Sequence, residues 1–461
     1  MERKNKKLKL WIGIVAGLII LLPLVWYLVV RLEGEKPTVE FELLSAFISQ
    51  SQDVAVNISD VKSGVRKVWI SLMKDGKEVT LVEEEFPSVG LGRGGKVHHQ
   101  QIRFKVDTGK LGLSDGDAML RLAVWDYAWR GWFSGNQSYL EKAITIDTRP
   151  PEIEVYSQAH NVSQGGTGLV IYRISELCPI SGVTVGEHFF AGRAGGFKDP
   201  KVLMAFFALN YDQGPGTDIF ITATDRAGNA TRAGLNHYIR RKVFKKDNIR
   251  VSDNFLERKL PEFSADLSHA ADATPLEKFL IINQNLRRAD YEKISQTCQT
   301  SEPNLLWQGT FKRLPRSAPQ AGFADHRTYV YNGRVIDHQV HLGIDLASVE
   351  HSPVPAANQG IVVFADRLGI YGRTVLIDHG LGLFSMYAHL NSISVSVGQK
   401  LKKGEILGRT GASGLAGGDH LHFGMLIQHT FVNPIEWWDA AWITNNIASK
   451  IDQVKSRLGQ E

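Results

Sequence analysis

Cysteine is scarce in this chain of 461 residues, which contains only Cys178 and Cys298. The two residues fall in different predicted segments, so they do not establish a disulfide and none is predicted. The excess of one charge sign is also small, because 53 Lys and Arg stand against 48 Asp and Glu, a formal net charge of +5, and the Lys and Arg are spread along the sequence. This distribution does not imply a nucleic-acid partner. The length indicates about three domains.

Two common functional signatures are also missing. The sequence contains no His-Glu-x-x-His pattern, which excludes a site built from two histidines and a glutamate base on one helix. The glycine-rich stretch from Gly90 to Gly95 lacks the Gly-Lys-Ser/Thr ending of a phosphate-binding loop and has no helix after it. We therefore interpret this stretch as a flexible turn.

The N-terminus predicts a membrane anchor. A basic segment, 1–9, precedes the uncharged run from Leu10 to Val30. As a helix this run is ~31 Å long, which matches a bilayer core of roughly 30 Å. A cleaved signal peptide is the rival interpretation, but its apolar region would be shorter, and no small-x-small cleavage site follows Val30. We expect an uncleaved single-pass helix in the inner (plasma) membrane, with a cytoplasmic basic tail and the bulk of the chain on the periplasmic side.

The next two segments predict a mainly β protein. Short alternating or apolar runs separated by polar turns, with a hairpin signal at Lys74–Lys77, indicate a β-sandwich over 37–149. A second sandwich is expected over 150–240, because Asp225-Arg226-Ala227 repeats the pattern of Asp126-Tyr127-Ala128. The turn that begins at Asp225 resembles those of bacterial immunoglobulin-like domains. The resemblance implies two Ig-like modules, which we interpret as spacers rather than wall-binding surfaces.

Residues 241–300 have a different, helical character. Thr274-Pro275-Leu276-Glu277 is a capping box with proline at the first helical position. Phe279, Ile282 and Leu286 then follow at helical spacing. We expect a short helical connector here, ahead of the chain's last domain.

Three histidine-bearing stretches near the C-terminus predict a metal site. His420 and His422 alternate within an apolar run, so in a strand they point to the same face. His341 and Asp345 are four residues apart, and His389 lies in a third strand-like stretch. Neutral imidazole and carboxylate are common ligands of zinc. Each stretch alone is weak evidence, but together, within about one domain length, they indicate a metal centre.

The same stretches resemble the LytM/lysostaphin-type zinc metallopeptidases of bacterial cell walls, over roughly residues 335–438. One departure is Gly424, where the family often has glutamate. The resemblance implies an antiparallel-β peptidase domain over 301–438 with a terminal helix over 439–461. The apolar stripe of that helix favours packing on the catalytic domain, with a coiled-coil contact as the alternative, and consists of Ile443, Ile447, Ile451, Val454 and Leu458. Further stretches that fit the family pattern in order are Pro353–Val362, Ile377–Gly380, Val397–Glu405 and Asn433-Pro434.

The resemblance also implies a ligand set and a reaction. One Zn²⁺ would be held by His341, Asp345 and His422, while His389 and His420 would act as catalytic residues beside it. The implied reaction is hydrolysis of peptide cross-links in peptidoglycan by a metal-activated water. The remaining histidines of the domain are expected on the surface or in packing roles: His326, His338, His351, His379 and His429.

Two alternatives to an active peptidase stay open. Some relatives have lost ligands and activate cell-wall amidases, so a catalytically silent regulator is the first alternative; the presence of all five motif residues argues against it. Val397–Glu405 also resembles the hairpin of biotinyl or lipoyl carrier domains, but Lys402-Lys403 lacks the usual context of the modified lysine, and a carrier would not explain the histidines. In relatives, segments before the catalytic domain can cover the zinc cleft. The corresponding segments here are 240–300 and Asn304–Val340.

Overall fold

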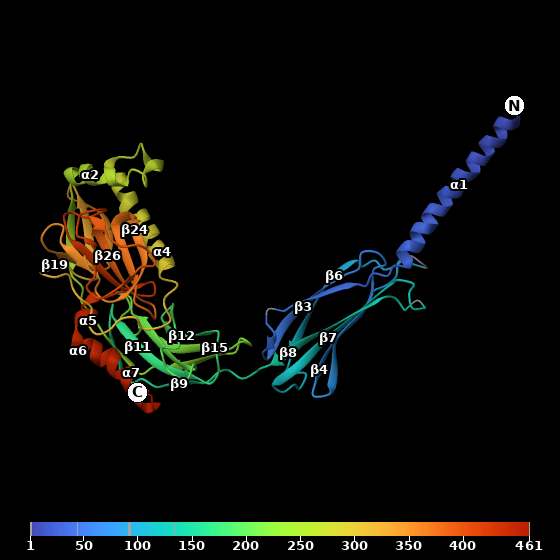
Figure 1. The fold of residues 1–461 in the computed structure, drawn as a ribbon, viewed down its shortest axis with the longest axis horizontal. Coiled ribbons are helices and arrows are strands. Elements are labelled where there is room, and N and C mark those ends of the chain that lie inside the picture. Colours follow the sequence, from blue (N-terminus) through green and yellow to red (C-terminus); the bar gives the residue numbers. More distant parts are fainter. Residues whose placement is uncertain (1, 44, 91–93, 133, 461) are drawn as a thin grey trace. The chain divides into compact units, whose positions relative to one another are not determined.

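The computed structural model describes residues 2–43, 45–90, 94–132 and 134–460. The chain divides into two compact units (Figure 1). The first comprises Met1–Pro150 with Asp225–Asn229, and the second comprises Pro151–Thr224 with Ala230–Glu461. The protein is mainly β, with one apolar helix at the N-terminus. Residues 91–93 of the glycine-rich stretch lie outside the described residues.

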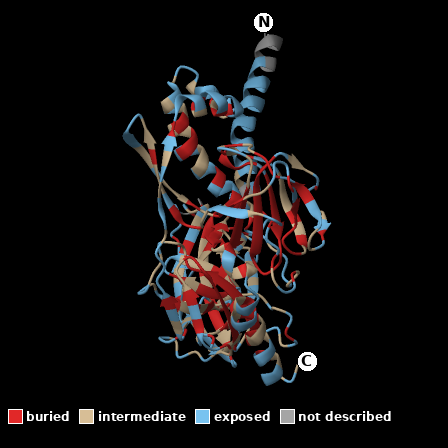
Figure 2. Cartoon of the chain, turned by 90° about the vertical axis from the view of Figure 1, so that its left-hand side faces the viewer, coloured by how far each residue is buried: buried red, intermediate tan, exposed pale blue. Residues whose placement is uncertain are grey.

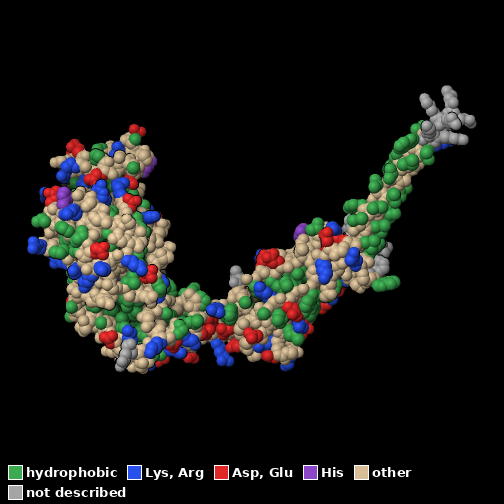
Figure 3. Space-filling model, viewed as in Figure 1, with side chains coloured by type: hydrophobic (Ala, Val, Ile, Leu, Met, Phe, Trp, Pro, Cys, Tyr) green, Lys and Arg blue, Asp and Glu red, His purple; other side chains and the backbone are tan. Residues whose placement is uncertain are grey.

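The first element is the long helix α1 (Glu2–Arg31). Its segment Leu8–Val29 is apolar and long enough to cross a membrane, and none of it is buried inside the protein. Hydrophobic side chains cover the surface of this helix (Figure 3). Pro23 lies inside the helix without ending it. An apolar helix with no protein partner over most of its length is what the sequence predicts for a membrane-spanning segment.

The first β-sandwich follows in the same unit. The predicted hairpin forms, because Asp75 (φ 48°) and Gly76 (φ 77°) both take the left-handed conformation that a two-residue turn requires. Two clusters of buried apolar residues lie in this part of the chain. One sheet contains β1 (Thr38–Glu42), β3 (Ser51–Ser59) and β6 (His99–Asp107), and the other contains β2 (Phe47–Ile48), β8 (Gln137–Ile146), β7 (Gly116–Asp126), β4 (Val65–Lys74) and β5 (Lys77–Glu85).

A second β-sandwich begins the second unit. Cys178 lies in this sandwich, and Cys298 is buried in the connector. One sheet has the order β14 (Val202–Ala208), β11 (Thr167–Ile174), β9 (Ile153–Val155), and the other has the order β13 (His188–Ala191), β12 (Ile180–Val185), β15 (Ile219–Thr224), β16 (Ala230–Gly234), with a parallel pair β10 (His160–Ser163) and β17 (His237–Arg240) beside them.

The connector is packed into the second unit rather than free. Thr274 and Glu277 form the predicted capping box at the start of α3 (Pro275–Leu280), which continues through a π-helical turn into α4 (Arg287–Thr297). The carboxylate of Asp290 on α4 accepts a hydrogen bond from the backbone N–H of Ile370, and burial raises its pKa to about 6. Before these helices come β18 (Lys246–Val251) and α2 (Asp253–Lys259).

The peptidase-like part is built on one antiparallel sheet. β18 pairs in parallel with β20 (Asp325–Tyr331), which in turn pairs with β21 (Arg334–His341). A separate small sheet is formed by strands that come between β22 and β30 in sequence: β23 (Pro353–Pro355), β29 (Ile406–Arg409) and β27 (Ser392–Ile393). The main sheet has the order β19 (Ala318–Ala321), β22 (Ile344–Ala347), β30 (Leu421–Ile427), β26 (Leu383–Leu390), β25 (Gly372–Asp378), β24 (Gly360–Leu368), β28 (Lys400–Leu401), with β31 (Thr430–Val432) paired to β30.

The C-terminal helices connect the peptidase sheet to the second sandwich. α5 (Pro434–Trp438) carries Trp437, which is fully buried and lies against Phe206 of the sandwich and Phe311 of the peptidase part. The half-buried side chain of Glu436 accepts a hydrogen bond through its carboxylate from the backbone N–H of Thr167 at 2.9 Å. These contacts fix the two β structures to each other.

The last helix also packs on the second sandwich, whereas the sequence favoured packing on the catalytic domain. After α5, a new helix, α6 (Ala440–Ile443), begins with Asp439 as its N-cap; the Asp439 carboxylate accepts from backbone N–H groups of the first turn. In α7 (Ser449–Arg457), Lys450 donates to the carbonyl of Leu169, and Arg457 pairs with Glu154. The apolar stripe predicted burial correctly but carried no information on which surface would cover it. One buried cluster now extends through the sandwich, the connector and the peptidase sheet (Figure 2).

Candidate metal centre

His341 and Asp345 come from two strands that follow each other in the chain, with a tight connection, and belong to different sheets. His341 ends β21, and Asp345 is the second residue of β22. Gly343 lies between them, and a Cβ there would be only 2.5 Å from the ring of His422. Only glycine therefore allows this backbone to pass the imidazole. Nε2 of His341 lies 2.9 Å from Oδ1 of Asp345.

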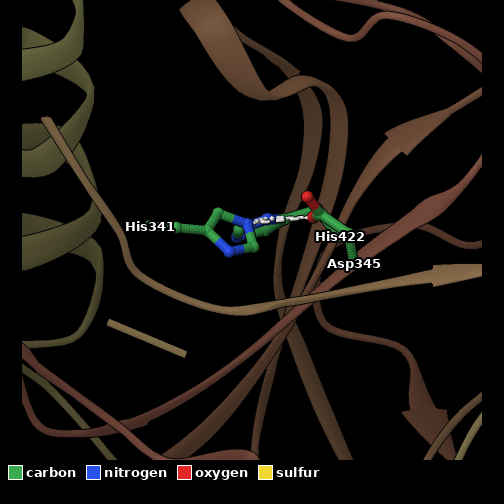
Figure 4. A group of neighbouring side chains, drawn as sticks. All are labelled: His341, Asp345 and His422. Carbon is green, nitrogen blue, oxygen red and sulfur yellow. Dashed lines mark hydrogen bonds and ion pairs between the residues drawn. The ribbon is translucent and has the colours of Figure 1, made fainter. Parts of the chain in front are cut away.

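His422 reaches the same point from β30. β22 and β30 are antiparallel, and Asp345 is directly opposite His422, so the two side chains share one face of the sheet. Nδ1 of His422 lies 3.0 Å from Oδ1 of Asp345 and 2.9 Å from Nε2 of His341. All three side chains are buried. Figure 4 shows their polar atoms converging on one small volume.

His420 lies beside this group, as the alternation in the sequence predicted. Its Nε2 is 3.5 Å from Oδ1 of Asp345, and its ring centroid is 4.9 Å from that of His389. The side chain is 12% exposed, compared with 4% for His422. His420 is thus the member of the group that is more open to solvent.

His389 joins the site through an irregularity of β26. Ala388 is directly opposite His422, so a regular strand would send the next side chain, that of His389, to the other face. Between Tyr387 and Leu390 the pairing with β25 shifts by one residue, and His389 has φ 60°. This β-bulge turns the imidazole toward the site, where its ring centroid is 5.8 Å from that of His422.

Backbone carbonyls set the tautomers of three histidines. Nδ1 of His341, His389 and His420 lies 2.8–2.9 Å from the carbonyl oxygens of Gly322, Ser413 and Gly418 respectively. Because a carbonyl oxygen only accepts, each Nδ1 carries the hydrogen and donates. In the neutral imidazole Nε2 then bears the lone pair, directed away from the backbone. His422 differs, because its Nδ1 faces the group and its buried Nε2 has no hydrogen-bond partner among the described residues.

The donor set of His341, Asp345 and His422 fits a metal cation. Nε2 of His341 and Oδ1 of Asp345 both present lone pairs at 2.9 Å, an arrangement that a cation between them stabilises. The three donor atoms all lie within 4.8 Å of one another. Two imidazole nitrogens and one carboxylate oxygen are a donor set that zinc uses in catalytic sites.

The three ligand candidates and two further histidines are those that the sequence singled out. His379, expected to have a structural role, lies elsewhere, where its ring contacts the carbonyl of Gln359 and the hydroxyl of Ser385. Burial lowers its pKa to about 4. The other four histidines of this part of the chain also lie outside the group: His326, His338, His351 and His429.

Arg327 is a site residue that the sequence analysis missed. From β20, its Nη2 donates to Oδ2 of Asp345 at 2.9 Å. Asp345 therefore directs one oxygen to the two histidines and the other to a guanidinium. Burial alone would raise the pKa of Asp345, but the charges and hydrogen bonds around it hold that pKa well below its ordinary value. The sequence did not single out Arg327, because it lies outside the histidine-bearing stretches and is 18 residues away from its partner Asp345.

Electrostatics distinguish the two outer histidines. Burial, with a smaller contribution from His420 and His422, holds the pKa of His389 well below its ordinary value. Burial would lower the pKa of His420 too, but the Asp345 carboxylate more than offsets this and raises it. At neutral pH, His389 is thus neutral, with Nε2 free of a proton.

The connector holds the glycine-rich loop 411–418 that precedes His420. Lys259 of α2 donates from Nζ to the carbonyl of Ala412 at 2.5 Å, and Glu262 accepts from the backbone N–H of Gly414 at 2.9 Å. Ser413, between these two contacts, supplies the carbonyl that binds His389. The loop is therefore fixed on one side by the connector and on the other by a histidine of the site.

Comparison with known proteins points to one family. Residues 339–434 match Peptidase family M23. Over 97 residues, 21% of this chain, the sequence is 38% identical to DD-carboxypeptidase/endopeptidase Mpg of Neisseria meningitidis, covering 22% of that protein. Over 132 residues, 28% of this chain, it is 30% identical to peptidoglycan DD-endopeptidase ShyA of Vibrio cholerae, covering 30% of that protein.

A third relative has a different role in its name. Over 95 residues, 21% of this chain, the sequence is 36% identical to murein hydrolase activator EnvC of Escherichia coli, covering 23% of that protein. The chain thus matches less than a third of the length of these relatives. Among solved structures, the catalytic domain of lysostaphin from Staphylococcus simulans is 24% identical, with a TM-score of 0.25, covering 28% of this chain and 98% of that domain. The C-terminal part of the chain is a peptidase family M23 domain.

Proposed function

We propose that this protein is a zinc-dependent endopeptidase that hydrolyses peptide cross-links of bacterial peptidoglycan. The observation that carries the proposal is the convergence of His341, Asp345 and His422 on one point, with His389 and His420 beside it. The family match and the relatives named peptidoglycan DD-endopeptidases support the substrate class.

His341, Asp345 and His422 would hold one Zn²⁺. When bound, zinc supplies a Lewis acid that polarises a carbonyl and lowers the pKa of a bound water to about 7. The backbone carbonyl of Gly322 keeps Nε2 of His341 unprotonated, which suits a metal ligand. Arg327 orients the carboxylate of Asp345 by binding its second oxygen.

His389 and His420 would handle protons and charge on the substrate side. Each has Nδ1–H bound to a backbone carbonyl, so its Nε2 is the atom left to act on substrate or water. Neutral His389 can accept a proton at Nε2, whereas His420, with its raised pKa, is better suited to donate one to the developing oxyanion.

The proposal includes location. Helix α1 would anchor the protein in the inner membrane with its basic start in the cytoplasm, so that the two β units lie on the periplasmic side, where peptidoglycan is found. The two β-sandwiches would be Ig-like modules. A reporter that is active only in the periplasm, fused after Glu461, should give signal, and the mature protein should retain Met1 to Val30.

A catalytically silent activator of a cell-wall amidase is the second candidate. The similarity to a murein hydrolase activator favours it. The complete donor set and the two adjacent histidines favour catalysis, because an activator needs none of these side chains. The two candidates differ in whether the purified protein alone releases products from the wall.

Digestion of purified, cross-linked peptidoglycan tests the proposal. Full-length protein in detergent, loaded with zinc, should release un-cross-linked muropeptides, identified by mass. Asp345→Ala should release none, and chelation followed by zinc should abolish and then restore the activity. An activator would leave the wall intact alone but accelerate an added amidase, and that result would replace the peptidase proposal.

A further inference from the structure

The first β-sandwich presents an aromatic loop beside the end of α1. Trp129 to Trp132 belong to the connection between β7 and β8. Trp132 is 96% exposed, more than Trp11 (65%) or Trp26 (69%) on the apolar helix itself. A tryptophan exposed to this degree has no packing role in the sandwich, so its indole is available for another partner.

Contacts with the last turn of α1 fix the position of this loop. The ring centroids of Trp129 and Tyr27 are 5.5 Å apart in an edge-to-face arrangement. The backbone N–H of Trp129 donates to the carbonyl of Arg31 at 2.7 Å, and the Arg31 guanidinium lies 5.5 Å from the Trp129 ring centroid. The loop is thus attached to the helix at the level of residues 27–31.

The chain between helix and sandwich is also bound to the sandwich rather than free. Nη1 of Arg31 donates to the carbonyl of Tyr127, and the carboxylate of Glu33 accepts from the backbone N–H of Ser63. The side-chain amide of Asn136 donates to the carbonyl of Glu35. These hydrogen bonds of residues 31–35 therefore fix the end of α1 to the sandwich.

These contacts set the depth of the loop. The apolar segment ends at Val29, so Tyr27 lies ~3 Å inside that end. Trp129 contacts both Tyr27, before that end, and Arg31, after it, so it lies close to the end of the apolar segment. The headgroup region adds roughly 5–7 Å beyond the hydrocarbon core. We propose that the Trp129–Trp132 loop lies in the outer interfacial region of the bilayer that α1 crosses, with Trp132 among the phospholipid headgroups.

The chemistry of the loop suits this partner. Tryptophan is favoured at the membrane interface because its ring is apolar and its N–H can reach polar headgroups. Arg130, also exposed, can bind phosphate. The inference rests on the proposed membrane anchor. It adds that the sandwich contacts the bilayer surface at a second point, in addition to its connection to α1.

Depth-dependent fluorescence quenching tests the inference on the full-length protein. Ser134→Cys places a probe two residues after Trp132, in the same β7–β8 connection, and leaves Trp132 intact; the background is Cys178→Ser, in which the buried Cys298 does not react. Each single-site variant carries a polarity-sensitive fluorophore and is reconstituted in phosphatidylethanolamine–phosphatidylglycerol vesicles. Lipids spin-labelled near the headgroup or near the chain end are the membrane quenchers, and iodide is the aqueous one.

Two control positions make the result decisive. Asp75→Cys lies at the opposite end of β4, roughly 30 Å away, and Leu22→Cys lies inside α1. We expect Ser134→Cys to be quenched by headgroup-labelled lipid and shielded from iodide, Asp75→Cys to show the reverse, and Leu22→Cys to be quenched by chain-end label. Adding Trp132→Glu should remove most of the lipid quenching at residue 134, whereas Trp132→Tyr should keep it.

The outcomes separate this inference from the anchor. If residue 134 behaves like residue 75 while residue 22 is quenched by chain-end label, the anchor stands and the docking of the loop is wrong. If residue 22 is not quenched by lipid, both the anchor and the docking are wrong. If Trp132→Glu leaves the quenching at residue 134 unchanged, insertion of Trp132 is wrong, and its exposed ring would suit a protein partner instead.

Discussion

Nη2 of Arg327 lies 2.9 Å from Oδ2 of Asp345, the carboxylate whose other oxygen faces His341 and His422. The guanidinium thus holds one oxygen so that the other is directed at the metal position. Ligating carboxylates held in this way are less free to rotate and keep their charge.

Removing that guanidinium should weaken metal binding without destroying the site. Arg327→Gln is expected to lower zinc affinity by roughly 10–100-fold, the usual range for groups that orient a ligand. Competition with a fluorescent chelator measures this affinity. Arg334→Gln, a loss of the same charge at an exposed position on the neighbouring strand, is the matched control. Equal affinities in the two variants would contradict the orienting role.

The connector is expected to influence catalysis through loop 411–418. Glu262→Ala removes the acceptor for the N–H of Gly414. The carbonyl of Ser413, the residue before Gly414, should then hold the imidazole of His389 less firmly. Because His389 is a proposed catalytic residue and not a ligand, kcat should fall while zinc content stays constant. Amide exchange at Gly414 should become faster. Glu257→Ala, an exposed carboxylate one turn earlier, should change neither quantity. Slow exchange at Gly414 in Glu262→Ala would refute this coupling.

Glu436 predicts a pH dependence of stability. Burial raises its pKa to about 8 from an ordinary 4.5, so the folded protein holds this proton where the unfolded chain releases it. Between pH 4.5 and 8 the folded state binds more protons, and its stability therefore falls as pH rises, by at most about 1.4 kcal/mol per pH unit. Glu436→Gln lacks this titration, so its Tm should gain on the wild type from pH 5 to pH 8. A constant Tm difference would show that Glu436 is ionised in the folded protein.

Sequence patterns predicted the parts of the fold that local chemistry determines. The turn at Asp75-Gly76, the capping box at Thr274 and the shared face of His420 and His422 each depend on residues close in sequence, and each is present. The antiparallel sheet of the peptidase part also follows the resemblance to LytM-type enzymes.

Other features depend on contacts that no local pattern encodes. The bulge that turns His389 into the site needs φ 60° at a residue that does not favour it, and the surrounding structure imposes that conformation. Arg327 on β20 and Asp345 on β22 belong to different sheets, and only the tertiary packing of those sheets brings them together. Trp437 and α7 pack on the second sandwich because that surface is apolar. Its apolar residues come from both β11 and β14, so no single stretch of sequence shows the surface.

The hypothesis that upstream segments cover the zinc cleft is a proposal, with Arg327 and the carbonyl of Gly322 as contacts between the segment Asn304–Val340 and the site. A truncated protein that starts near residue 320 would remove most of these upstream segments, but it would also change the core of the peptidase part. It would lose Phe263, Ile282 and Ile294, which are buried in the same core as the sheet. Single substitutions in the full-length protein, such as Arg327→Gln, keep that core and are the better test of activity on soluble muropeptides.

Zinc content and turnover, measured together on five alanine variants of the full-length protein, test the central claim most directly. His341→Ala, Asp345→Ala and His422→Ala should lose both zinc and activity, because two protein ligands rarely hold the ion. His389→Ala and His420→Ala should keep near-stoichiometric zinc yet lose roughly 10²–10⁴-fold in kcat, the usual contribution of acid–base catalysis. If His420→Ala loses zinc while His422→Ala keeps it, the ligand assignment is reversed. If no variant changes zinc content or wall hydrolysis, the metallopeptidase account is wrong.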